Sequence, residues 1–164
     1  TVNWYVKTLE DQGYLSRIKG PNGKRALTLI HREHATTTTA RLPLLGLIAA
    51  GEPIEALENP EMVDVPVSLL HPDHYVLQVK GNSMIDEQIH DKDYIVARKT
   101  NTARSGQIVV ALINGEATLK YYVQGPGGVE LHPRNPDFPI IKVDPKDDFH
   151  INGVLLYSFR NYLN

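Results

Sequence analysis

An Asn-Gly pair between two strand-like runs is the feature that most limits the folds open to this chain. Residues 107–113 form an apolar run, Asn114-Gly115 follows, and residues 117–123 form a second run that contains β-branched and aromatic side chains. Asn-Gly in this position favours the tight type I′ turn that joins two antiparallel strands. The chain is therefore expected to form a β-hairpin here.

Composition and patterning extend the β prediction to most of the chain. Glycine and proline together make 23 of the 164 residues, and Val, Ile, Thr and Tyr are frequent. We expect a mainly β fold, with further strands at residues 62–67, 75–80, 94–98, 129–132, 140–143 and 149–159. The last run is apolar and terminal, so it is interpreted as a sheet edge that a second copy of the chain could cover.

Size and cysteine content narrow the class of protein. A chain of 164 residues that is 41% hydrophobic can bury one good core, or one core and a small module. No run approaches the roughly 18 apolar residues of a membrane span, and no signal peptide is recognisable, so we expect a cytoplasmic protein with no membrane partner. The absence of cysteine excludes disulfides and thiolate metal sites.

Charge is divided unevenly along the chain. Residues 1–41 carry seven basic and three acidic side chains, whereas residues 42–164 carry ten basic and sixteen acidic ones. The front segment is therefore the part suited to bind a polyanion.

The front segment has the pattern of a helix followed by a basic hairpin. Apolar residues recur at helical spacing from Val2 to Leu9, and two alternating runs flank residues 20–23. This order is typical of the second half of a winged helix-turn-helix, so we expect an N-terminal truncation; an ordinary amphipathic helix and a solvated hairpin are the alternative. The candidate DNA contacts are Thr1, Asn3 and Trp4 to base edges, and Arg17, Lys19, Lys24 and Arg25 to phosphates.

Residues 31–41 include four consecutive threonines, have no periodicity, and are expected to form a linker. This prediction places a partial winged-helix DNA-binding domain at residues 1–30 and a larger domain at residues 42–164. Two H-x-x-H spacings, at His31/His34 and His71/His74, lack a carboxylate at helical spacing. We interpret them as surface histidines and expect no metal and no cofactor.

Ser83 stands where an alternating strand, residues 77–80, runs into Gly81-Asn82. We interpret it as a candidate nucleophile. Residues 83–86 also fit an S-x-x-D capping box, in which Ser83 would be the N-cap of a helix. Both interpretations can hold, because backbone N–H groups at a helix N-terminus suit a developing oxyanion.

Lys120 is the candidate general base. On the second strand of the predicted hairpin, Lys120 shares a face with Thr118 and Tyr122. A lone strand lysine is by default exposed to solvent, and its spacing from Ser83 does not show that the two meet. A serine hydroxyl needs a neighbouring base, and lysine can serve only if its pKa falls from near 10.4 by roughly three units, as burial can achieve.

A candidate cleavage site lies upstream of the serine. Residues 42–53 are largely apolar and include Ala49-Ala50-Gly51. The Ala50-Gly51 bond suits a peptidase with a narrow pocket, because neither side chain obstructs the scissile carbonyl. The alternative is the buried end of a strand. The serine, the lysine and this bond together suggest a protease that cuts its own chain.

These segments resemble the LexA family of self-cleaving repressors, which have a Ser-Lys peptidase domain, over nearly the whole chain. Residues 42–53 resemble the family's cleavage-site region, and residues 79–84 resemble its nucleophile motif. Residues 118–120 lie where the general-base lysine is expected. The helix and hairpin at the front resemble the second half of the family's DNA-binding domain.

The resemblance implies an all-β peptidase domain with Ser83 as nucleophile and Lys120 as base. It implies a repressor of DNA-damage (SOS) genes that binds double-stranded operator DNA as a homodimer. The two subunits would be joined through their C-terminal domains. A RecA filament on single-stranded DNA would prompt cleavage of Ala50-Gly51. We hypothesise that a loop from Leu45 to Ala50 folds over the site and removes water from Lys120. A Ser-Lys peptidase acting in trans and a repressor that never cuts itself remain alternatives.

Overall fold

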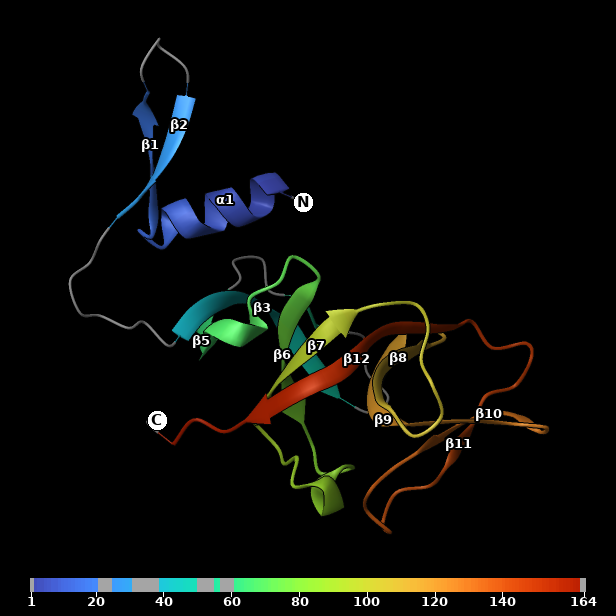
Figure 1. Cartoon of the computed structure of the whole chain (residues 1–164). Helices are drawn as coiled ribbons and strands as arrows, with labels where there is room; N and C mark the ends of the chain where they lie inside the picture. Colours follow the sequence, from blue (N-terminus) through green and yellow to red (C-terminus); the bar gives the residue numbers. More distant parts are fainter. Residues whose placement is uncertain (1, 21–24, 31–38, 50–54, 57–60, 163–164) are drawn as a thin grey trace. The chain divides into compact units, whose positions relative to one another are not determined.

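The computed structural model describes residues 2–20, 25–30, 39–49, 55–56 and 61–162. The chain forms two compact units. Figure 1 colours the chain in sequence order, from blue at the N-terminus to red at the C-terminus. One unit contains Thr1–Arg41 with Asp64–Pro72, and the other contains Leu42–Val63 with Asp73–Asn164. Most of the predicted linker lies outside the described residues, but its last three residues already belong to a strand.

The first unit contains the helix and the basic hairpin that the sequence predicts. Gly13, with a φ of 74°, follows the helix, and the N–H of Tyr14 donates to the carbonyl of Leu9 across the helix end. The two strands pair antiparallel. This unit also includes a segment from much later in the sequence, which the predicted division had assigned elsewhere. The bounds are α1 Val2–Asp11, β1 Leu15–Lys19, β2 Arg25–Leu29 and the 3-10 turn η2 Val67–Leu69.

The mainly β class is confirmed by one large sheet. Among the described residues its strand order is β11-β10-β9-β8-β12-β7-β6-β3-β4, and β5 also pairs with β3. β3 runs parallel to β6. The bounds are β3 Thr39–Ala49, β4 Glu55–Ala56, β5 Met62–Pro66, β6 His74–Lys80, β7 Tyr94–Lys99, β8 Ile108–Ile113, β9 Glu116–Gly125, β10 Gly128–His132, β11 Ile141–Lys142 and β12 Phe149–Phe159.

The Asn-Gly hairpin forms as predicted. β8 and β9 pair antiparallel, and Ile113 lies opposite Glu116 across the turn. Asn114 and Gly115 have φ values of 53° and 86°. A positive φ at both central positions is the requirement of a type I′ turn, which explains why this dipeptide specifies the hairpin.

The prediction that the terminal strand is a sheet edge is wrong. β12 lies between β8 and β7: its first half pairs with β8, where Ile151 faces Ala111, and its second half pairs with β7, where Tyr157 faces Val96. An 11-residue strand is long enough to bond a different neighbour with each half. Terminal position in the sequence therefore does not imply an edge position in the sheet.

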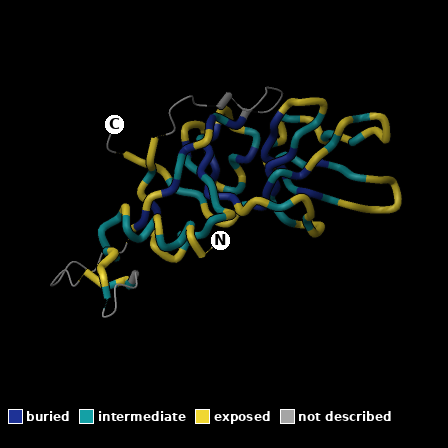
Figure 2. The backbone as a smooth tube through the Cα atoms, turned by 90° about the horizontal axis from the view of Figure 1, so that it is seen from above, coloured by how far each residue is buried: buried dark blue, intermediate teal, exposed yellow. Residues whose placement is uncertain are grey.

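The buried core of the second unit lies on both sides of this long strand. One cluster combines side chains of β6, β7, β8 and β9, including Leu77, Ile95 and Leu119. A second cluster joins β8, β9, β10 and β12. Figure 2 shows the buried positions concentrated in the strands and the exposed ones in the connecting loops. Within the described part of the chain, no helix has the length and apolar character needed to cross a bilayer.

Gly153, where β12 changes partner, is expected to tolerate no side chain. A Cβ there would overlap the hydroxyl of Tyr75 and lie 3.0 Å from the carbonyl oxygen of Arg98. Gly153→Ala should therefore lower the free energy of unfolding in urea by about 1–3 kcal/mol, as overpacking does.

Gly127→Ala is the matched control, because no atom lies within 4 Å of the added carbon. Equal destabilisation by both substitutions would contradict the prediction. Adding Tyr75→Phe should recover part of the loss at Gly153, because it removes the overlapping oxygen.

Candidate active site

Ser83 and Lys120, which the sequence could not place together, are in direct contact. The Nζ of Lys120 donates a hydrogen bond of 2.7 Å to the Oγ of Ser83. The serine lies in the loop after β6 and the lysine lies in the middle of β9. β7, β12 and β8 separate these two strands in the sheet order, so the sheet must curve to bring them together.

Ser83 is not a helix cap, and the capping-box interpretation is wrong. The 3-10 turn η3 spans Ile85–Glu87, its cap position is Met84, and no side chain caps it. Gln88, with a φ of 61°, ends the turn at once. An S-x-x-D pattern specifies a cap only when a helix follows. Because Ser83 does not cap the short 3-10 turn that follows it, its hydroxyl is free to accept from the lysine.

Lys120 departs from the expected exposure of a strand lysine. It is 1% exposed. Its Nζ also donates to the Oγ1 of Thr118 at 2.9 Å and to the carbonyl of Leu119 at 3.0 Å. An ammonium has three N–H donors, and the three acceptors satisfy all of them. A charged group can remain in this buried position because each donor has a partner.

Burial lowers the pKa of Lys120 from 10.5 to about 8. Removing an amine from water disfavours its charged form, and no carboxylate lies among the three bonded partners to oppose this effect. At pH 7 about one lysine in ten is then neutral, against fewer than about one in a thousand for a free lysine. A neutral Nζ has a lone pair that can accept the proton of Ser83.

Thr118 is a site residue that the sequence analysis did not select. It is 3% exposed, and its hydroxyl accepts from Lys120. The signal was available, since Thr118 precedes Lys120 by two residues and shares its strand face. Only the inward orientation of that face, which the sequence left open, shows that the threonine orients the lysine.

A distant loop holds the peptide backbone around Ser83. The N–H of Arg134 donates to the carbonyl of Ser83, and the carbonyl of Arg134 accepts from the N–H of Asp86, both at 2.8 Å. The side-chain amide of Asn135 donates to the carbonyl of Asn82 at 2.9 Å. These bonds span about fifty residues of sequence, and no local pattern indicates them.

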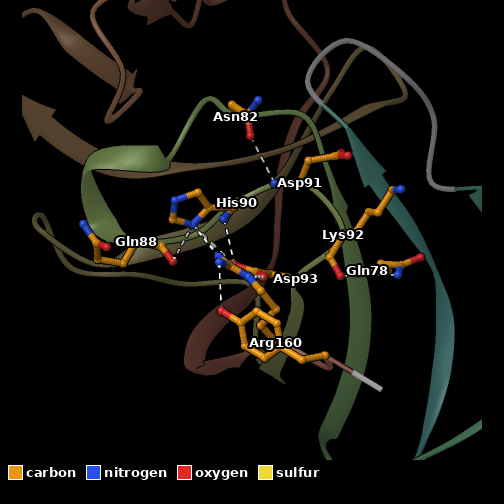
Figure 3. A network of polar contacts seen from close by, with 9 residues as sticks. Gln78, Asn82, Gln88, His90, Asp91, Lys92, Asp93 and Arg160 are labelled. Atoms are coloured by element: carbon orange, nitrogen blue, oxygen red, sulfur yellow. Dashed lines mark hydrogen bonds and ion pairs between the residues drawn. The ribbon is translucent and has the colours of Figure 1, made fainter. Parts of the chain in front are cut away.

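A polar network, shown in Figure 3, closes the base of the loop that carries Ser83. Arg160, just after β12, donates to both carboxylate oxygens of Asp93 at 2.5 and 2.9 Å and to Nδ1 of His90 at 2.5 Å. Within the loop, the N–H of Asp91 donates to the side-chain oxygen of Asn82 at 3.1 Å. The segment that carries Ser83 is therefore anchored at both ends.

Asp93 is 3% exposed, and its charge is compensated. Burial alone would raise the pKa of Asp93, but hydrogen bonds from Arg160 and from the backbone N–H of His90, together with the charge of Arg160, lower it below its usual value. Asp93 therefore remains ionised at neutral pH and keeps its ion pair with Arg160.

The candidate cleavage residues Ala50 and Gly51 lie outside the described residues. The strand before them is described, and it corrects the hypothesis of a loop beginning at Leu45, because residues 45–49 belong to β3. Ala49 at the end of β3 lies opposite Lys80 at the end of β6. Because β3 and β6 run parallel, β3 ends beside the point where β6 ends and the loop of Ser83 begins.

The candidate DNA contacts are only partly described. Thr1 and Lys24 lie outside the described residues, and Arg25 is described only as a backbone position of β2. Asn3 and Trp4 lie on the first turn of α1. Arg17 donates to the carboxylate of Glu10 at 2.6 Å. Lys19, at the end of β1, is exposed.

Comparison with known proteins gives a consistent result. The family model described as Peptidase S24-like matches residues 43–156. The LexA repressor of Syntrophotalea carbinolica is 44% identical over 164 residues, which cover 99% of this chain and 78% of that protein. The LexA repressors of Pseudothermotoga lettingae, 44% identical over 96% of this chain and 77% of theirs, and of Syntrophobacter fumaroxidans, 40% identical over 96% and 75%, are similar.

A β domain in which a buried strand lysine bonds a loop serine has the arrangement expected of a peptidase of the Ser-Lys class. The chain belongs to the LexA repressor family, whose peptidase part is of the S24 type. It is therefore a transcriptional repressor of the SOS response that carries an autoproteolytic serine peptidase domain.

The lowered pKa of Lys120 predicts a specific pH dependence of stability. The unfolded chain keeps the Lys120 proton up to pH 10.5, whereas the folded chain loses it near pH 8. Between these values the unfolded state binds more protons, so deprotonation stabilises the fold as the pH rises. The unfolding free energy of the parent should therefore rise by about 3 kcal/mol between pH 7 and pH 10.5. Lys120→Met should lack this rise, because it has no amine to titrate.

The measurement is urea unfolding across this pH range in a Ser83→Ala background, which removes the hydroxyl of the candidate nucleophile. Lys142→Met is the control, because the side chain of Lys142 is 80% exposed. A pH-independent difference between Lys120→Met and its parent would contradict a buried, easily deprotonated lysine.

Proposed function

We propose that Ser83 is the nucleophile and Lys120 the general base that cleave the Ala50-Gly51 bond of the same chain. The observation that carries this proposal is the 2.7 Å hydrogen bond from the buried lysine to the serine hydroxyl. A serine hydroxyl is a weak nucleophile until a neighbouring base takes its proton. A lysine whose pKa is about 8 can do so at neutral pH.

The reaction proceeds in two steps. Neutral Lys120 takes the proton of Ser83 as Oγ attacks the carbonyl carbon of Ala50, and the lysine then delivers this proton to the nitrogen of Gly51 as the peptide bond breaks. The product is an ester between Ser83 and Ala50. Water then attacks this ester, with Lys120 accepting the water proton and returning it to Oγ, which releases the new carboxyl group and regenerates the site.

The sheet register supports cleavage within one chain. β3 ends at Ala49, one residue before the proposed bond, and Ala49 is opposite Lys80, three residues before Ser83. Neighbouring strands are about 5 Å apart, and three residues reach at most about 10 Å, so the distance through space from the end of β3 to the serine is short. Because the bond to be cleaved and the serine belong to one chain, the fold only has to position them and no binding of a separate substrate is needed.

For the rest of the chain we propose the organisation of a DNA-damage repressor. Residues 1–30 form part of a winged-helix domain that binds operator DNA, residues 31–41 form a linker, and residues 42–164 form the peptidase and dimerisation domain. A RecA filament on single-stranded DNA stimulates the cleavage in the cytoplasm.

We also propose dimerisation through the C-terminal domain, although β12 lies between β8 and β7 in the sheet order. The second half of β12 bonds only β7 among the described strands, and Leu156 and Tyr157 on it are 40% and 43% exposed. A second copy of the chain could cover this apolar side.

Self-cleavage is tested by intact-mass analysis of the purified chain during incubation from pH 6 to pH 10. Fragments 1–50 and 51–164 should appear at a rate that rises with pH and levels off above a midpoint near 8, where Lys120 loses its proton. Ser83→Ala and Lys120→Ala should each abolish the fragments.

Lys99→Ala is the matched control for the lysine, because Lys99 is an exposed lysine that also lies on a strand. It should cleave at the parental rate. Cleavage that is unaffected by Lys120→Ala would refute the dyad. Turnover of an added Ala-Gly peptide would favour a peptidase acting in trans, and an intact chain even with a RecA filament would favour a repressor that never cuts itself.

DNA binding predicts a separate salt effect. If Lys19 contacts a phosphate, Lys19→Ala should weaken binding to labelled duplex DNA and reduce the slope of log affinity against log salt by about one. The measurement is fluorescence anisotropy at several salt concentrations. Lys146→Ala, in the second unit, should leave the slope unchanged, and an unchanged slope for Lys19→Ala would remove Lys19 from the interface.

A further inference from the structure

The peptide bond between Asn82 and Ser83 is held in one orientation from outside its own loop. The side-chain Nδ2 of Asn135 donates to the carbonyl oxygen of Asn82 at 2.9 Å. The only other described donor to this oxygen is the N–H of Ile85, at 3.3 Å. Asn135 therefore provides the shorter of the two bonds that fix the direction of this carbonyl.

The direction of the carbonyl fixes the direction of the next N–H. The chain has no cis peptide bond among the described residues, and in a trans peptide the N–H points opposite to the C=O. The N–H of Ser83 therefore points away from Asn135. Among the described residues, no acceptor is bonded to it.

Asn135 is itself fixed in the orientation that this role needs. Its Oδ1 accepts from the N–H of Asp137 at 3.0 Å. Because Oδ1 can only accept, this bond assigns the two ends of the amide and leaves Nδ2 to face Asn82. The neighbouring residue, Arg134, bonds the carbonyl of Ser83 at 2.8 Å, so the peptide planes on both sides of the serine are held by the same loop.

We propose that Asn135 is a positioning residue, which orients the backbone N–H of Ser83 as a donor to the oxyanion formed in self-cleavage. This inference rests on the proposed function. When Oγ of Ser83 attacks a carbonyl, negative charge develops on the carbonyl oxygen beside the nucleophile. A preoriented N–H of the nucleophile itself can stabilise that charge, and such donors contribute only if they are already aimed before the reaction.

The test compares two variants of Asn135. Asn135→Asp keeps the acceptor for Asp137 and removes the donor to Asn82, while Asn135→Ala removes the donor without adding charge. Each should lower the plateau rate of self-cleavage at high pH by about 10- to 100-fold, as misaligned catalytic groups do. The midpoint near pH 8 should not move for Asn135→Ala, because Asn135 does not contact Lys120.

Asn114→Asp is the matched control. Asn114 also donates through Nδ2, to Asp147, and accepts through Oδ1, from the N–H of Asp148, but in the β8–β9 turn. It should cost thermal stability without lowering the plateau rate. This separates loss of positioning from general destabilisation, which a merely structural asparagine would cause at either place.

The outcomes are distinguishable. A lower plateau with an unchanged midpoint for Asn135→Ala, together with a parental rate for Asn114→Asp, supports the inference. Two results would overturn the inference and leave the proposed function intact. One is a parental cleavage rate for both Asn135 variants. The other is a rate loss that follows the fall in melting temperature in Asn135→Asp, Asn135→Ala and Asn114→Asp alike. If the parent itself is not cleaved, even with a RecA filament, the proposed function fails and the inference falls with it.

Discussion

Burial of the Lys120 amine is the constraint on which the candidate site depends. Removing an ammonium group from water is unfavourable. The fold offsets part of this cost because each of the three N–H donors has an acceptor: the hydroxyls of Ser83 and Thr118 and the carbonyl of Leu119. The remaining cost appears as a pKa of about 8. The same burial that weakens the folded state therefore gives Lys120 the pKa that its proposed role as a base near neutral pH requires.

The rest of the second unit makes this burial possible. The curved sheet brings β9 to the loop after β6, although three strands separate them in the strand order. The loop itself is held by residues from distant parts of the chain: Arg134 and Asn135 bond its backbone, and Arg160 closes its base through Asp93. The serine is thereby held in place before any substrate arrives, as its proposed role as a nucleophile requires.

Local patterns predicted what depends on local geometry. The I′ turn at Asn114-Gly115 formed because its two positive φ angles suit few other residues, and α1 and the β1–β2 hairpin formed because their apolar periodicity leaves few alternatives. The predictions failed where tertiary neighbours decided the result. The apolar run of β12 found a different partner for each half, and only a short 3-10 turn, which Ser83 does not cap, followed the serine.

The sequence by itself determined the mainly β class, the strand that leads to Ser83 and the face that Lys120 shares with Thr118, because strand alternation and turn chemistry act over a few residues. Only the tertiary structure decided that this face is buried and that the lysine meets the serine. Both facts depend on the curvature of the whole sheet, to which many weak contacts contribute. No short segment encodes that curvature, so the pKa of Lys120 and the anchoring role of Asn135 could be seen only in the folded chain.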